Sequence, residues 1–229
     1  MEQTDRLIRK RIGQVVVQTI ASSIVLFAIA NDLRWTMAWV YLGIGILITS
    51  FNFFVLIRIN PEVVAERARQ SKDLRRWDKF LLALYGLMAL ALPVVAGLDR
   101  RFGWSAPLSP TVHGVSAVLL LLSNGFVTWA MAVNAHFSKT VHVQEERGHA
   151  VTMNGAYRFV RHPCYSGWLV SWLVTPLVLG TWWTYVPVCG AIVILVIRTA
   201  LEDKTLQEEL PGYVEYAQQT RYRLLPGIW

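Results

Sequence analysis

The chain contains 229 residues, of which 54% are hydrophobic and 16% charged, and its net charge is +7. Soluble globular domains carry about 25% charged residues, so this composition excludes an ordinary soluble protein and favours one embedded in a lipid bilayer. The basic residues lie between apolar runs, where they suit anionic lipid head groups. We therefore expect the lipid bilayer as a partner and no nucleic acid. Cys164 and Cys189 form neither a disulfide framework nor a zinc pattern.

Six apolar runs follow one another along the chain, and a helix needs about 20 such residues to span a bilayer. They cover residues 13–30, 35–57, 80–98, 113–133, 165–180 and 183–197. The last two are short and can form a tilted helical hairpin, which leaves five or six spans. Between the second and third runs, residues 61–79 are expected to form an amphipathic surface helix or a solvated linker helix. The sequence therefore predicts an all-α fold, a multi-spanning transmembrane helical bundle.

The positive charges are divided unevenly between the two ends of this predicted bundle. With six spans, one side receives residues 1–13, 58–79, 135–164 and 198–229. These segments hold 19 of the 22 Lys and Arg residues. Cytoplasmic loops of membrane proteins carry such an excess of Lys and Arg. We therefore expect an integral, multi-pass membrane protein with both termini in the cytoplasm.

Polar residues gather in the connection between the fourth and fifth runs, from His136 to Tyr165. Four of the five histidines of the chain lie there, at positions 136, 142, 149 and 162. Their spacing fits no usual metal pattern, and we expect no metal site. A single histidine in such a segment is more often a hydrogen-bonded loop residue than a catalytic group.

Arg198 and Glu202 form a second polar feature, at the end of the last apolar run. Residues four apart share one face of a helix. An ionisable pair at a membrane boundary that faces the bundle is a functional candidate. A surface ion pair with a snorkelling arginine explains the same spacing equally well.

Residues 155–165 read Gly-Ala-Tyr-Arg-Phe-Val-Arg-His-Pro-Cys-Tyr. This segment resembles the G-x-Y-x-x-x-R-H-P-x-Y signature of the isoprenylcysteine carboxyl methyltransferase family. Residues 149–152 are similar to the H-x-L-V segment of that family. The family's C-terminal helix and tail resemble Arg198-x-x-x-Glu202-Asp203, Gly212-Tyr213-x-x-Tyr216 and Arg223-x-x-Pro226. The resemblance covers about residues 134–229, and the first 110 residues match only as hydrophobic spans.

This resemblance divides the chain into N-terminal transmembrane helices, 1–133, and a methyltransferase region, 134–229, with a cytoplasmic cofactor-binding loop region and a C-terminal helix. It implies S-adenosyl-L-methionine as the methyl donor. It also implies catalytic roles for Arg198 and Glu202, with Arg198 binding the carboxylate of the substrate. The implied donor contacts are Gln144, His149, Ala150, Val151, Thr152, Tyr157, His162, Pro163, Cys164, Tyr165 and Glu202.

Two features depart from the family pattern. The family often has two glutamates where this chain has Glu202 and Asp203. The loop between Gln144 and His149 is shorter than in eukaryotic members, which makes Gln144 the weakest assignment.

The chemistry of these residue types agrees with carboxyl methylation. Transfer of a methyl group from a sulfonium cation to a carboxylate partly cancels charge, so a dry, well-oriented site helps. A carboxylate needs no general base, and one arginine can hold it by a bidentate fork. Glu202 can accept hydrogen bonds from the donor, while Tyr157 and Tyr165 can stack on adenine or face the sulfonium.

The expected function is S-adenosylmethionine-dependent methylation of a lipid-linked, isoprenylcysteine-like carboxylate, so we expect a lipophilic or prenylated substrate as a partner. The alternatives are a phospholipid N-methyltransferase and a thiol S-methyltransferase, both of which need a base such as His136 or His162. A non-enzymatic membrane scaffold or a transporter is a further alternative. Because the polar cluster lies at one face and not at mid-membrane, transport is disfavoured.

Overall fold

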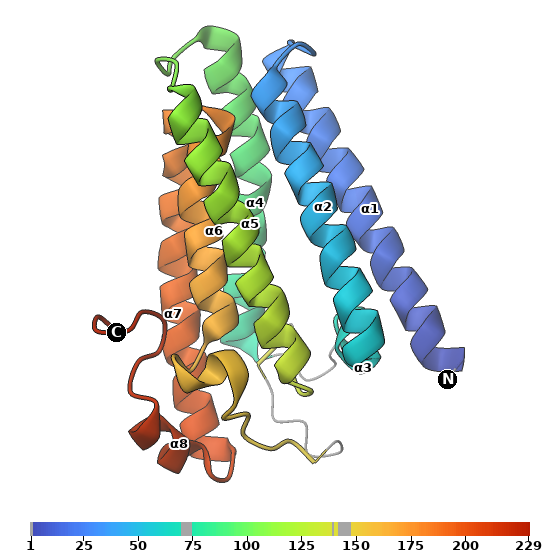
Figure 1. Ribbon diagram of the computed structural model, residues 1–229, viewed down its shortest axis with the longest axis vertical. Coiled ribbons are helices and arrows are strands. Elements are labelled where there is room, and N and C mark those ends of the chain that lie inside the picture. The colour runs from blue at the N-terminus through green and yellow to red at the C-terminus, as the bar shows by residue number, and fades with distance from the viewer. Residues whose placement is uncertain (1, 70–74, 139, 142–147) are drawn as a thin grey trace.

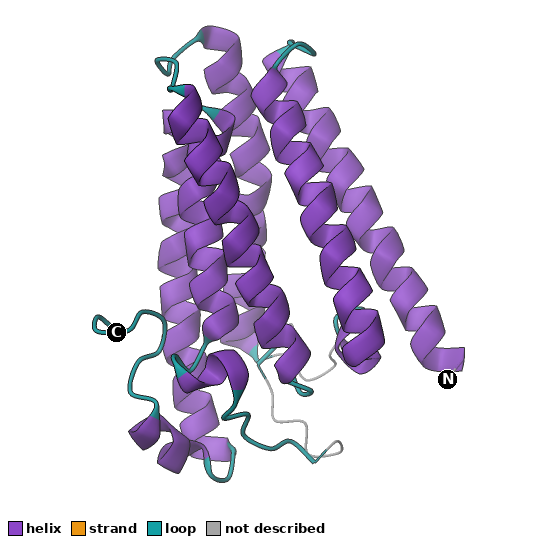
Figure 2. Cartoon of the chain, viewed as in Figure 1, coloured by secondary structure: helices purple, strands orange, loops and turns teal. Residues whose placement is uncertain are grey.

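A computed structural model describes residues 2–69, 75–138, 140–141 and 148–229 of the chain. Within these ranges the regular structure consists of helices without any strand, as Figure 2 shows. The predicted all-α fold is therefore confirmed. The helices are α1 (Glu2–Ala30), α2 (Thr36–Ile59), α3 (Pro61–Glu66), α4 (Arg76–Phe102), α5 (Pro110–Val133), α6 (Pro163–Leu179), α7 (Tyr185–Glu209) and α8 (Tyr213–Gln219), with 3-10 turns η2 (Gly155–Arg158) and η3 (Trp182–Thr184).

Five apolar helices of the described chain are long enough to cross a membrane, and α6, with 17 residues, is a shorter sixth. The long ones are α1, α2, α4, α5 and the continuous run Trp182–Glu209. This number agrees with the expectation of five or six spans, and the chain is an integral, multi-pass membrane protein. Pro93 lies inside α4, which continues through it.

The helices run alongside one another, with α4, α5, α6 and α7 grouped together (Figure 1). Helix α1 packs on α4, and helix α2 packs on α5. The N-terminus, α8 and the C-terminal segment lie toward the same end of the bundle. Only 6% of the most apolar window of α2 is buried inside the protein. Most of its apolar side chains therefore face outward, as in a helix surrounded by lipid.

The expected surface helix over residues 61–79 is wrong in its extent. Helix α3 ends at Glu66, and Arg76 already begins the long helix α4. The hydroxyl of Thr4 donates a hydrogen bond to Glu62 at 2.8 Å, which joins α3 to α1. Asp78, in the first turn of α4, is completely buried. The side chain of Asp78 therefore lies inside the bundle and not on its surface.

The opposite end of the bundle is closed by the buried carboxylate of Asp99, near the end of α4. Its oxygens accept hydrogen bonds from the amide and hydroxyl of Ser105, at 2.8 and 2.6 Å, and from the amide of Trp183 at 3.3 Å. These contacts join the loop after α4 to η3. Because one side chain holds both connections, the last two spans are fixed against the rest of the bundle.

Helices α5 and α6 approach each other closely at Gly167. A Cβ atom at this position would collide with the side chain of Val127 and lie 2.8 Å from the carbonyl oxygen of Ser123. Since a backbone oxygen of a packed helix cannot move aside cheaply, only glycine suits this crossing. The same glycine lies two residues after the segment with the family signature, so its packing also positions that segment.

We predict that Gly167→Ala lowers the free energy of unfolding by about 1–3 kcal/mol, the usual cost of overpacking. Thermal unfolding of the purified protein in detergent, followed by tryptophan fluorescence, measures the effect. Gly125→Ala is the matched control, because a Cβ at Gly125 in α5 meets no atom within 4 Å. The control should be neutral or slightly stabilising, since alanine favours a helix over glycine. Equal destabilisation by both variants would contradict the prediction.

Candidate functional site

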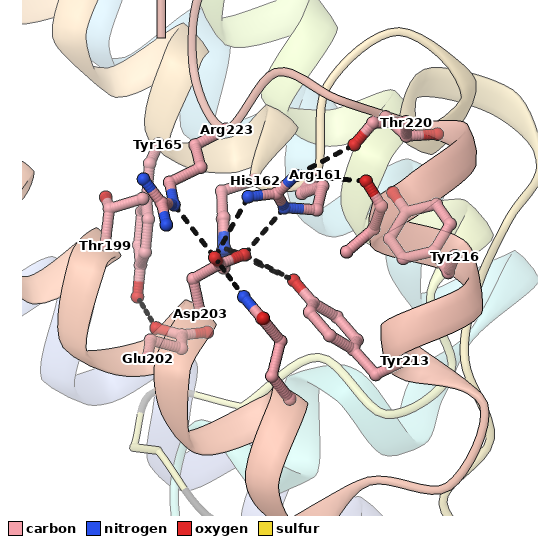
Figure 3. Close-up of polar contacts among 12 residues, drawn as sticks. Arg161, His162, Tyr165, Thr199, Glu202, Asp203, Tyr213, Tyr216, Thr220 and Arg223 are labelled. Carbon is pink, nitrogen blue, oxygen red and sulfur yellow. Dashed lines mark hydrogen bonds and ion pairs between the residues drawn. The ribbon is translucent and has the colours of Figure 1, made fainter.

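A buried carboxylate, that of Asp203 on α7, collects hydrogen bonds from several separate parts of the chain (Figure 3). Arg161 contacts it with two nitrogens, Nε at 2.7 Å from Oδ1 and Nη2 at 3.0 Å from Oδ2. Arg223 donates from Nε to Oδ2 at 2.8 Å, and Tyr213 donates its hydroxyl to Oδ1 at 3.0 Å. Asp203 therefore connects the signature segment, α7, α8 and the C-terminal tail.

The segment with the family signature is also joined to the C-terminal tail through backbone hydrogen bonds. The amides of Arg161 and His162 donate to the carbonyl oxygens of Tyr222 and Arg223, at 2.9 and 3.0 Å. The Nη1 atom of Arg161 donates to the Thr220 carbonyl at 3.0 Å. Arg161 is thus an organising residue, which spans from the carboxylate of α7 to the tail.

His162, the histidine of the signature, lies against the same carboxylate. Its Nε2 atom is 3.2 Å from Oδ1 of Asp203, and its ring stacks with that of Tyr165, with the ring centres 5.8 Å apart. His162 also precedes Pro163, the first residue of α6. Proline suits the first helical turn because it lacks the amide proton that would be unpaired there. The signature therefore positions a histidine and starts a helix within two residues.

A second cluster of polar side chains surrounds the hydroxyl of Tyr165 on α6. This hydroxyl donates to Oε2 of Glu202 at 2.5 Å and accepts a hydrogen bond from Nη1 of Arg198. The Nε atom of Arg198 donates to Oδ1 of Asp78 at 2.8 Å. The structure therefore brings Arg198 and Glu202 together at one tyrosine, as their spacing on a shared helix face predicts.

Asp78 holds a loop as well as an arginine. Its Oδ2 atom accepts a hydrogen bond from the amide of Val141 at 2.9 Å, while Oδ1 faces Arg198. The two oxygens of one buried carboxylate thus fix the side chain of Arg198 and the backbone near the start of the polar connection. Sequence reasoning missed this residue, because it assigned residues 61–79 to the surface. The signal available in the sequence was a single acidic residue, Asp78, just before an apolar run.

One cavity lies between these two clusters. Its walls include the expected donor contacts that the structure describes, and they come from the polar connection, η2, the start of α6 and α7. The expected residues on its walls are His149, Ala150, Val151, Thr152, Tyr157, His162, Pro163, Cys164, Tyr165 and Glu202. Gln144 lies outside the described residues. Arg198 is not among the lining residues and lies behind Tyr165, whose hydroxyl it contacts.

Two pairings of side chains on the cavity wall were not predicted from the sequence. Asn134 lines the cavity and donates from Nδ2 to the Tyr157 hydroxyl at 2.9 Å. His136 and His149 stack their rings with centres 4.7 Å apart, and both line the cavity. Each pair forms because separate segments of the chain fold next to each other. No local sequence pattern predicts such a pair. Within the part of the chain that the structure describes, no group of three or more potential ligands forms a metal site.

Three tyrosines on the cavity wall keep their protons. Burial raises the pKa values of Tyr157, Tyr213 and Tyr216, because a phenolate loses hydration there. Tyr216 donates its hydroxyl proton to the carbonyl oxygen of Tyr157 at 2.7 Å. These side chains therefore serve as neutral donors and ring surfaces and not as anionic bases.

We predict that Asp203→Asn lowers the free energy of unfolding by about 3–5 kcal/mol, because the buried Arg161 and the partly exposed Arg223 lose their counter-charge. Chemical unfolding in detergent micelles measures this change. Glu208→Gln, which affects an exposed pair on α7 with 3.7 Å between Lys204 Nζ and Glu208 Oε1, should cost less than about 1 kcal/mol. A similarly small loss in both variants would show that Asp203 does not organise the site.

Comparison with known proteins matches residues 116–208 to the model of the isoprenylcysteine carboxyl methyltransferase family. The chain is similar to a mouse protein named protein-S-isoprenylcysteine O-methyltransferase, with 28% identity over 58% of this chain and 47% of that protein. A rat protein of the same name is 28% identical over 33% of this chain and 25% of that protein. The matches thus span about half, or less, of the length of these curated relatives.

The solved structure of the eukaryotic intramembrane Ras methyltransferase ICMT has the same fold as this chain. Its TM-score is 0.60 at 15% sequence identity, and the alignment covers 91% of this chain and 73% of that one. The aligned region therefore includes the spans that precede residue 116 as well as the matched segment. Residues 116–208 of the chain are thus similar to the isoprenylcysteine carboxyl methyltransferase family, and the chain shares its fold with the solved structure.

Proposed function

We propose that this protein is a membrane methyltransferase that uses S-adenosylmethionine to methylate the carboxylate of a lipid-linked, isoprenylcysteine-like acceptor. One observation carries the proposal: residues 149–152, Tyr157, residues 162–165 and Glu202, which resemble the family's donor site, line a single cavity at one end of the bundle. Segments far apart in sequence meet there. The names of the mouse and rat relatives support the same chemistry.

The lining suits a sulfonium nucleoside. Glu202 offers a carboxylate whose Oε2 atom is held by Tyr165, and a carboxylate is complementary to the amino and ribose hydroxyl groups of such a donor. Tyr157 and Tyr165 present aromatic rings beside it, and a ring face attracts a cation. When bound, the donor supplies the methyl group. Residues 149–152 add a stretch of backbone outside any helix, whose amide and carbonyl groups are available to an adenine edge.

The cavity must widen to admit this donor. Its volume is about 90 Å³, whereas sites for drug-sized ligands measure roughly 300–1,000 Å³. The helical walls, α6 and α7, are packed against each other and against the tail. We assign the widening to residues 148–154, which no helix includes. Binding of the donor would then order this segment over the ligand.

Arg198 is the residue we propose for the acceptor carboxylate. It contacts the hydroxyl of Tyr165, and its guanidinium carbon lies 5.4 Å from the centre of the Tyr165 ring. An acceptor carboxylate would take the place of the Tyr165 hydroxyl at the Nη1 atom. Asp78 would keep hold of Nε and so fix the plane of the guanidinium. Because the carboxylate is already ionised near pH 7, the residues around it need only orient it and exclude water.

Two alternative acceptors, a phospholipid amine and a small thiol, would each have to lose a proton. The stacked pair of His136 and His149 on the cavity wall provides a candidate base for such a reaction. Transfer of a labelled methyl group to prenylcysteines, phospholipids and thiols distinguishes the acceptors. A base-labile product identifies a carboxyl ester, while a base-stable product would favour one of the alternatives.

The orientation and the division of the chain follow as parts of this proposal. The segments that hold most Lys and Arg residues lie at the same end as the cavity, so the cavity would face the cytoplasm, where the soluble donor is available. Residues 134–229 would form the methyltransferase region. Residues 1–133 would supply the transmembrane helices and, through Asp78, one contact that positions Arg198.

We predict that the purified protein binds S-adenosylmethionine and its demethylated product, with heat measurable by titration calorimetry. Glu202→Gln should weaken binding about tenfold or more, because a hydrogen bond to a charged group contributes about 1.5–3 kcal/mol. Glu208→Gln, at an exposed position on the same helix, should bind as the unmodified protein does. No heat with either ligand for the unmodified protein would refute the proposed donor.

We predict that Arg198→Ala lowers kcat for a carboxylate acceptor by about 100-fold or more, the usual effect of removing a charged group aimed at the reacting centre. Donor binding should change little. Asp78→Asn should lower kcat in the same direction, and Asp78→Glu should recover part of it, because a carboxylate again faces Nε. The control is Arg75→Ala, which breaks only a solvent-accessible pair with Glu209. Equal loss of donor binding in Arg198→Ala would instead place Arg198 in the donor site.

A further inference from the structure

Two arginines approach each other where α1 and α3 meet, and neither has an acidic partner among the described residues. Arg67 directly follows α3 and is partly buried. Its polar contact is the sulfur of Met131, 3.6 Å from Nη1. Burial lowers the pKa of Arg67 to about 10, with a further contribution from the charge of Arg11. Both side chains remain cationic at pH 7. Two neighbouring cations held in low-dielectric surroundings favour an anionic ligand.

These arginines line a groove between α1, α2 and α5. The groove has a volume of about 360 Å³ and ends against Trp168 of α6. Its walls alternate apolar side chains, such as Val15 and Phe53, with polar ones, such as Gln18 and Asn52. A smaller hollow continues from it between α2, α5 and α6, and the two share Gly45, Asn124 and Trp168. A ligand with a polar head and an apolar chain suits such a surface.

The position of the arginines points to a lipid of the surrounding bilayer. Arg11 lies just before the apolar part of α1, and Arg67 follows the short helix α3 that comes after α2, so both fall at the boundary of the spans. Anionic head groups concentrate at this depth. Only 11% of the most apolar window of α1 is buried within the protein, so most of this helix is open to the surrounding lipid.

We propose that the groove between α1, α2 and α5 binds an anionic phospholipid, whose phosphate pairs with Arg11 and Arg67 and whose acyl chain lies along α2 and α5. A phosphate offers several acceptor oxygens, which match the planar forks of two guanidinium groups. The lipid would fill the space between α1, α2 and α5. This site is separate from the donor cavity and does not depend on the proposed methyl transfer.

The bound lipid would also lie beside the candidate site. Trp168, at the end of the groove, has its ring centre 5.5 Å from that of Tyr165, which lines the donor cavity. An acyl chain at Trp168 would therefore contact the wall that separates the groove from the cavity. This places the lipid where it can restrict the motion of Trp168 without contact to the donor.

Native mass spectrometry of the full chain in detergent tests this site, with phosphatidylglycerol and phosphatidylcholine of identical acyl chains as probes. We expect preferential retention of phosphatidylglycerol. Arg11→Gln and Arg67→Gln should each lower that retention about tenfold, since each removes a charge-assisted contact. Arg67→Lys, which keeps the charge but loses the fork, should cause a smaller loss. Arg9→Gln, an exposed position in the same helix, should have no effect.

Three outcomes would overturn the proposal. The first is equal retention of the two lipids by the unmodified protein. The second is retention of phosphatidylglycerol that Arg11→Gln and Arg67→Gln leave unchanged, or that Arg9→Gln lowers to the same extent. The third is stoichiometric displacement of phosphatidylglycerol by a prenylcysteine, which would assign the groove to the methyl acceptor. Calorimetry with S-adenosylmethionine on the same samples tests the donor site separately, so failure of either proposal leaves the other standing.

Discussion

The buried carboxylate of Asp203 is the interaction on which this end of the molecule depends. A carboxylate removed from water is stable only when charged or polar partners compensate it, and here Arg161, Arg223 and Tyr213 do so from three separate segments. Each partner in turn needs the carboxylate. The signature segment, the tail and α8 are therefore fixed to α7 by a single requirement, and the cavity forms where these fixed elements leave space.

Asp78 is a second buried carboxylate that joins separate parts of the bundle. It belongs to α4, yet it holds the guanidinium of Arg198 on α7 and the backbone of Val141 in the polar connection. The N-terminal spans thus do more than anchor residues 134–229 in lipid. They supply a carboxylate that determines how one arginine faces Tyr165, and through it the candidate site.

Two kinds of positive charge lie at this end of the bundle, and their surroundings separate their roles. Arg161 and Arg198 form ion pairs with buried carboxylates, so their charges stabilise the structure around the cavity. Arg11 and Arg67 form no ion pair with any described residue, and they border a groove open to apolar chains. The uneven charge distribution, which first indicated only membrane orientation, therefore includes a paired set for the candidate active site and an unpaired set suited to lipid.

The sequence by itself determined the class of fold, the apolar spans and the segments that resemble the family, because hydropathy and short motifs depend on near neighbours. It also placed Arg198 and Glu202 on one face of a helix, and the structure brings both to Tyr165. Only the tertiary structure decided which carboxylates hold the arginines. Asp78 and Arg198 are 120 residues apart, and Asp78 looked like part of a surface helix until packing buried it. Such pairings depend on how whole helices pack, and no local pattern encodes that.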